Sequence, residues 1–149
     1  MTDLVLAIAH HFLIFSLVGI LTAELALSRP GVSGAALGRL AKVDGSYGIV
    51  ASLIIVVGIC RVIYGIKGAQ YYLHNPWFWG KMAAIVIVAL LSIFPTIAIL
   101  RWRKAAGNEP GFVPPERSIA SVRQYLMAEL AFLAIVIVCA ATMARFDHV

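Results

Sequence analysis

The apolar residues of this chain gather in four long blocks separated by short polar stretches. A membrane-spanning helix needs about 20 mostly apolar residues to cross roughly 30 Å of hydrocarbon, and each block is long enough. The bilayer offers no water to backbone N–H and C=O groups, so each block must satisfy these groups within a helix. We therefore predict four transmembrane helices, over residues 4–27, 47–66, 78–100 and 122–144.

The connections between these blocks are short, which makes consecutive helices antiparallel. The first connection, residues 28–46, has room for an interfacial turn of helix. The third, residues 101–121, is rich in Gly and Pro, which indicates a surface loop, with Ser118 as a cap for the fourth helix. The pattern predicts an all-α fold, an integral membrane antiparallel four-helix bundle that forms a single domain over residues 1–149.

Composition removes the main alternatives to a membrane protein. Of the 149 residues, 62% are apolar and 13% are charged, and the mean hydropathy is +0.94. This balance excludes a water-soluble globule of this size. Two cysteines in apolar blocks do not form the disulfide framework of a secreted domain. The first block follows a start without basic residues and is too long for a signal-peptide core, so we expect it to be retained.

The net charge of +5 comes from basic residues that flank the apolar blocks, so it indicates membrane topology and no nucleic-acid partner. Cytoplasmic connections carry an excess of Lys and Arg. The first and third connections are therefore predicted to be cytoplasmic, and both termini and residues 67–77 periplasmic. The basic residues concerned are Arg29, Arg39, Lys42, Arg101, Arg103, Lys104 and Arg117. Among aromatic residues, Tyr71, Tyr72, Trp77 and Trp79 suit the outer interface, and Trp102 suits the inner one.

Ionisable side chains within the spans cost a few kcal/mol each on insertion scales, so they are the most informative residues. A step of seven residues returns nearly to the same helix face, so His10 and Glu24 share a stripe. His11 lies about 100° around the axis. The predicted orientation places basic residues in the outer half and acidic residues in the inner half. The outer set is His10, His11, Arg61 and Lys81, and the inner set is Glu24 and Glu129.

A histidine inside a bundle, with cationic groups nearer the surface, suits haem b, because imidazole binds the iron and Arg or Lys binds the propionates. We therefore predict His10 or His11 as the metal ligand, with Arg61 and Lys81 beside the propionates. The other spans contain no histidine. A second axial ligand would come from Lys81, from Met82 or from a second protomer, and the last of these favours a homo-oligomer.

These residues also have structural explanations. The two adjacent histidines can hydrogen-bond between helices, and the basic residues near span ends can extend to the headgroups. The two glutamates can pair with Arg123 or Lys42 at the cytoplasmic boundary, or relay protons. Gly58 and Gly65 lie one heptad apart, which predicts close helix packing.

Several short motifs carry a family resemblance. They are Lys67-Gly68, Asn75-Pro76, Phe78-Trp79-Gly80-Lys81, Pro95-Thr96 and Arg101-Trp102-Arg103. Together with His10, His11 and Glu24, these motifs resemble a bacterial family of small four-helix membrane proteins of unknown function, over the full length. The resemblance implies a multi-pass protein of the bacterial inner (cytoplasmic) membrane.

A histidine in the first helix, together with a lysine that opens a later helix, is more distantly similar to the HemJ-type protoporphyrinogen oxidase and its CopD-like relatives. HemJ is a membrane bundle of comparable size that binds haem b, and this His and Lys matter for its activity. The histidine corresponds to His10 or His11, and the lysine to Lys81. The resemblance implies haem b as cofactor and leaves open whether the chain is an oxidoreductase of the HemJ type.

Two functional hypotheses follow. The first is a haem-b-binding integral membrane protein with an electron-transfer or porphyrin-related redox role, which works with a respiratory or redox partner in the lipid bilayer. The second is a non-haem accessory subunit or small transporter, whose buried His and Glu residues relay protons or bind a quinone or another small ligand. A third possibility is a structural assembly factor, in which the polar residues only join helices.

Overall fold

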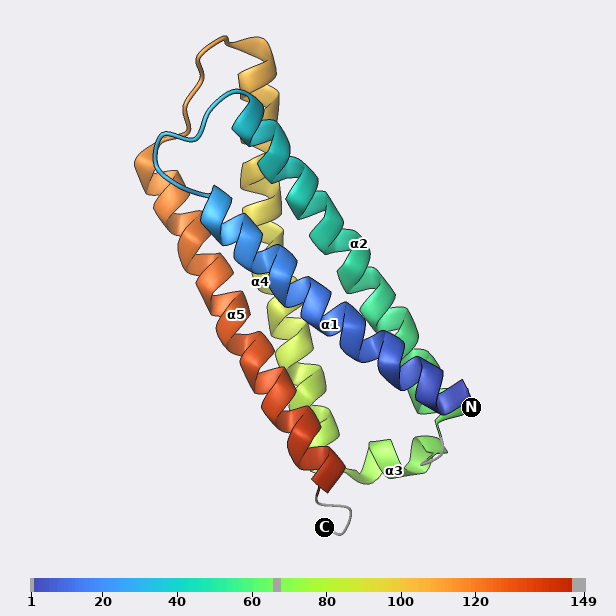
Figure 1. Cartoon of the computed structure of the whole chain (residues 1–149). Coiled ribbons are helices and arrows are strands. Elements are labelled where there is room, and N and C mark those ends of the chain that lie inside the picture. The colour runs from blue at the N-terminus through green and yellow to red at the C-terminus, as the bar shows by residue number, and fades with distance from the viewer. Residues whose placement is uncertain (1, 66–67, 146–149) are drawn as a thin grey trace.

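The computed structural model describes residues 2–65 and 68–145, and it consists of helices joined by short connections (Figure 1). The elements are α1 (Thr2–Leu27), α2 (Ala35–Tyr64), α3 (Gly68–His74), α4 (Pro76–Asn108) and α5 (Glu116–Arg145). No strand occurs within the described ranges. Helices α1, α2, α4 and α5 are each long and apolar enough to cross a membrane. The predicted all-α bundle of four membrane helices is therefore confirmed.

The four long helices form a ring in the order α1, α2, α4, α5, in which each helix packs against the next and α5 packs against α1. In Figure 1, α1 begins and α5 ends at the same end of the bundle, which we call the terminal end. The short helix α3 also lies there, in contact with α2 and α4. Connections 28–34 and 109–115 lie at the opposite end, which we call the loop end.

Two helices extend further at the loop end than their apolar blocks. α2 begins at Ala35 instead of residue 47, and α4 continues to Asn108 instead of stopping at residue 100. The loop predicted for these residues is wrong, because hydropathy marks only the part of a helix that lies in hydrocarbon. α5 begins at Glu116, so Ser118 lies in its first turn and is not the predicted cap. Residues 66 and 67, where the second predicted span ends, lie outside the described residues.

Proline, glycine and asparagine residues set the helix ends. Gly31 and Gly111 have φ angles of 79° and 89°, in the left-handed region that glycine adopts at little steric cost. The side chain of Asn75 caps α4 by accepting a hydrogen bond from the Trp77 backbone N–H at 2.9 Å, and Pro76 takes the first helical position. Asn75 therefore determines where α4 begins and how deep its later residues lie.

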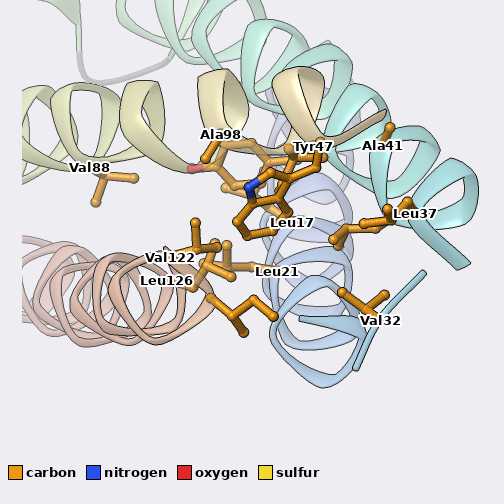
Figure 2. Close-up of a cluster of buried hydrophobic side chains, with 14 of the residues drawn as sticks. Leu17, Leu21, Val32, Leu37, Ala41, Tyr47, Val88, Ala98, Val122 and Leu126 are labelled. Carbon is orange, nitrogen blue, oxygen red and sulfur yellow. The ribbon is translucent and has the colours of Figure 1, made fainter. Parts of the chain in front are cut away.

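The buried apolar core extends from the loop end to the middle of the bundle (Figure 2). Leu21, Leu40, Ile99 and Ile119, one from each long helix, are all 0% exposed. Trp102 also belongs to this core, where it is 5% exposed. Its indole is covered because α4 continues beyond its apolar block alongside the other helices. Many large apolar side chains face outward along the bundle, which suits contact with lipid.

Candidate functional site

A small cavity at the terminal end collects the basic residues of three helices. His10 of α1, Arg61 of α2 and Lys81 of α4 line it together. Its volume is about 40 Å³, which is room for about two or three water molecules. The other lining residues are Gly58, Val62, Tyr72 and Met143. Every helix of the fold thus contributes to this cavity, and the predicted association of His10, Arg61 and Lys81 is present.

Glycine residues allow the helices to approach closely around this cavity. A Cβ atom added at Gly58 would lie 3.5 Å from Cε1 of His10. A Cβ atom at Gly65 would collide with the carbonyl oxygen of Arg61 and lie 3.3 Å from Oδ1 of Asp3. The close packing predicted for these glycines is thus present at Gly65, which lies tightly against Asp3 of α1, while Gly58 faces His10 of α1 at an ordinary contact distance.

The short helix α3 supplies an aromatic wall. The Tyr71 hydroxyl donates a hydrogen bond to the Met143 carbonyl at 2.9 Å, which fastens α3 to α5. The Tyr72 ring packs edge-on against Tyr71 at 5.4 Å and lies 5.8 Å from the Phe78 ring. Tyr72 is buried in the cavity wall and does not face the membrane interface as predicted. It turns inward because α3 folds across the end of the bundle.

The charged residues that line the cavity beside His10 are Arg61 and Lys81, and both are basic. Two buried polar atoms of the cavity residues, Nδ1 of His10 and Nε of Arg61, have no hydrogen-bond partner. Within the described part of the chain, the cavity therefore concentrates positive charge and free hydrogen-bonding atoms.

The structure separates the two adjacent histidines. His11 is exposed, and its Nδ1 lies 2.7 Å from the Ala7 carbonyl oxygen of its own helix. It does not line the cavity, so only His10 joins Arg61 and Lys81. Cys60 and Cys139 are free. Among residues 2–65 and 68–145, no three His, Cys, Asp or Glu side chains are grouped as a metal ion would require.

A second polar cluster lies nearer the loop end, and we call it the carboxyl layer. It contains three buried acids, Glu24 of α1, Asp44 of α2 and Glu129 of α5, which are 1%, 5% and 0% exposed. The Tyr47 hydroxyl donates to Oε2 of Glu129 at 2.9 Å. The Thr96 hydroxyl donates to Oδ1 of Asp44 at 2.7 Å. The layer therefore joins residues from all four long helices.

Neither glutamate forms its predicted ion pair. The Nη1 atom of Arg123 donates to the backbone carbonyls of Leu25 and Ser28, each at 2.8 Å, and Lys42 is exposed. The carbonyls at the end of α1 have no partner within the helix and therefore compete for the guanidinium. The Oε1 atoms of both glutamates are buried without a hydrogen-bond partner. The predicted pairing with Arg123 or Lys42 is wrong.

Sequence reasoning missed Asp44, Tyr47 and Thr96. Asp44 fell in a segment predicted as a loop, and the two hydroxyl residues carry no charge. The available signal was the spacing of Asp44 and Tyr47, because residues three apart lie on one helix face. That spacing becomes informative only when α2 is known to begin before residue 47.

The two polar clusters lie far apart along the bundle axis. His10 and Glu24 are separated by about four helical turns, or about 21 Å, as are Arg61 and Tyr47. The interior between them is apolar, with Leu17, Val88, Leu133 and Val136 buried. The hydroxyls of Ser16, Ser52, Ser92 and Thr142 donate to carbonyls of their own helices. In the described part of the bundle, side chains do not connect the cavity to the carboxyl layer.

Comparison with known proteins gives one family and no individual relative. A search of curated proteins found no match, and neither did a search of solved structures. A family model matches residues 2–146, nearly the whole chain. Its description agrees with the four membrane-length helices of the fold. The chain therefore belongs to the family described as "Predicted membrane protein (DUF2214)".

Proposed function

We propose that this protein binds an anionic oxygen group of a membrane-soluble ligand in the cavity between His10, Arg61 and Lys81. The observation that carries this proposal is the convergence of three basic residues, from three helices, on one small cavity. Basic groups inside a membrane bundle are costly and pair with acidic groups where they can. The charged side chains that line the cavity are basic, so a ligand oxygen would supply negative charge there.

The size and depth of the cavity favour an acid or quinone oxygen attached to an apolar tail. About 40 Å³ holds only a small polar group. Arg61 lies in the last turn of α2 and Lys81 near the start of α4, so the cavity lies near one hydrocarbon boundary. A tail would extend into the surrounding lipid. This function corresponds to a non-haem accessory subunit or a small transporter. A proton relay through the whole bundle has less support, because the interior between the two clusters is apolar.

Haem b is the second candidate, and Nδ1 of His10, which is buried without a partner, supports it. The likeness of His10 and Lys81 to the histidine and lysine of HemJ also favours haem and an oxidoreductase role. The cavity of about 40 Å³ is far smaller than the roughly 300–1,000 Å³ that larger ligands occupy. The residues present therefore do not fit a porphyrin in this packing.

Replacement of Lys81 by Met is expected to weaken binding of decanoate by about tenfold to a hundredfold. A charge-assisted hydrogen bond contributes about 1.5–3 kcal/mol, and about 1.4 kcal/mol corresponds to a factor of ten. The measurement is the thermal stabilisation of the detergent-purified protein by decanoate, with decanol as the uncharged probe and a short-tailed ubiquinone in parallel.

Two adjacent residues give a matched control. His10→Gln is expected to reduce the effect of decanoate, whereas His11→Gln, at an exposed position, is expected to leave it unchanged. Equal stabilisation by decanoate and decanol in every variant would contradict an anionic ligand. An absorption spectrum of the same preparation from haem-replete cells tests the second candidate, because a Soret band lost only in His10→Gln would favour haem.

We also propose that the loop end faces the cytoplasm of a bacterial inner membrane and the terminal end faces the periplasm. The basic residues near the loop end, among them Arg39, Arg101 and Arg103, support this orientation. An impermeant thiol reagent applied to intact cells should then label a cysteine placed at His74 and spare one placed at Lys42.

A further inference from the structure

The carboxyl layer is not used by the proposed ligand site. Glu24, Asp44 and Glu129 come from three helices and are almost completely buried. Asp44 and Tyr47 lie one turn apart on α2, and Tyr47 donates a hydrogen bond to Glu129 of α5. Glu24 lies on α1, which packs against both of these helices. Arg123, on the same helix as Glu129, uses Nη1 for backbone carbonyls instead.

Hydrogen-bond donors in the layer are fewer than the carboxyl oxygens. The Tyr47 hydroxyl donates a hydrogen bond to Oε2 of Glu129, and the Thr96 hydroxyl donates one to Oδ1 of Asp44. Oε1 of Glu24 and Oε1 of Glu129 remain buried without a partner. An ionised carboxylate can only accept hydrogen bonds, whereas a protonated carboxyl carries its own O–H donor. The arrangement lacks donors and positive charge, and a proton supplies both.

The electrostatic cost of burying ionised carboxylates also favours protonated carboxyl groups in this layer. An isolated ionised carboxylate is strongly disfavoured in an apolar interior, and like charges in contact add repulsion. The titratable groups of this layer are Glu24 from α1, Asp44 and Tyr47 from α2, and Glu129 from α5, while Arg123 of α5 binds the backbone carbonyls of Leu25 and Ser28. The residue from α4 is the neutral Thr96. Two neutral hydroxyls do not balance three negative charges.

We propose that Glu24, Asp44 and Glu129 form a proton-binding site inside the bundle, in which buried carboxyl groups are held in the protonated form. Proton release breaks one carboxyl O–H bond, leaves its electron pair on the oxygen and passes the proton to water. The existing hydrogen bonds from Tyr47 to Glu129 and from Thr96 to Asp44 then stabilise a carboxylate at either of these residues. This site is independent of the ligand proposed for the other end, because an apolar interior separates the two.

The test is infrared spectroscopy of the full chain in lipid vesicles at neutral pH in low-sodium buffer. The carbonyl stretch of protonated carboxyl groups is expected in the wild type and should shift in D₂O. Glu24→Gln and Glu129→Gln should each remove part of this band. Glu116→Gln, an exposed acid on the same helix as Glu129, should leave it unchanged.

Three outcomes would overturn the proposal. The first is a wild type without the band, a result that requires no variant to fold. The second is a band of equal intensity in Glu24→Gln and Glu129→Gln. The third is a band that sodium chloride abolishes, which would assign the layer to a metal cation instead of a proton. None of these measurements uses decanoate, so a failure here is distinct from failure of the ligand site.

Discussion

Replacing Gly58 with Leu is expected to abolish decanoate binding, with a loss of affinity of at least about a hundredfold. A Cβ atom at Gly58 already reaches 3.5 Å from His10, so a larger side chain must enter the small cavity and displace the imidazole. Two charge-assisted hydrogen bonds of about 1.5 kcal/mol each account for such a loss. The measurement is again the thermal stabilisation of the purified protein by decanoate.

Two further glycine variants show whether the effect is local. Gly58→Ala adds only the Cβ atom at an ordinary contact distance, so it is expected to retain most of the binding. Gly48→Leu lies on the same helix, at a site where an added Cβ meets nothing within 4 Å, and is expected to bind as the wild type does. Normal binding by Gly58→Leu would show that the ligand does not occupy this cavity.

The variant Ile99→Ala is expected to lower the free energy of unfolding by about 2–5 kcal/mol. Ile99 is 0% exposed and belongs to the apolar core. Truncation of a buried aliphatic side chain removes its contacts and leaves a cavity, with losses in this range. In the bilayer, helices are held together by such packing contacts, so the loss falls directly on bundle stability. Reversible unfolding in mixed detergent micelles measures the difference.

Leu100 provides the control at the next position. It is 49% exposed on the outer surface of α4, and substitutions at such positions usually change stability by about 0.5 kcal/mol or less. Leu100→Ala should therefore have little effect. A similar loss for both variants would mean that the face of α4 assigned to the core is incorrect.

The sequence was sufficient to predict the four helices, because the bilayer leaves the backbone no alternative to helical hydrogen bonding. The depth of His10, Arg61 and Lys81 followed from the same reasoning. The sequence did not show which of His10 and His11 faces the cavity. Adjacent residues point about 100° apart around a helix, and which face is packed depends on the neighbouring helices. The partner of Arg123 was mispredicted because backbone carbonyls, which carry no sequence signal, compete with the carboxylates.

The carboxyl layer could be predicted from the sequence only in part. Glu24 and Glu129 were identified because charge within an apolar block is visible in the sequence. Asp44 was hidden by the wrong start of α2, and its partner Thr96 resembles any other hydroxyl residue of a membrane helix. The other such hydroxyls nearby, including Ser52 and Ser92, bind their own helices. Only the packing of α2 against α4 distinguishes Thr96 from them.

The uneven distribution of the apolar core affects how the bundle can open. Segments with few buried apolar contacts open locally at a lower free energy than the rest of a protein. The main apolar cluster extends from the loop end to the middle of the bundle, whereas the cavity at the terminal end is lined partly by polar side chains and Gly58. Separation of the helices at the terminal end therefore leaves the tightly packed half intact. If the terminal end opens in this way, we expect the proposed ligand to enter sideways from the lipid leaflet, without passing through water.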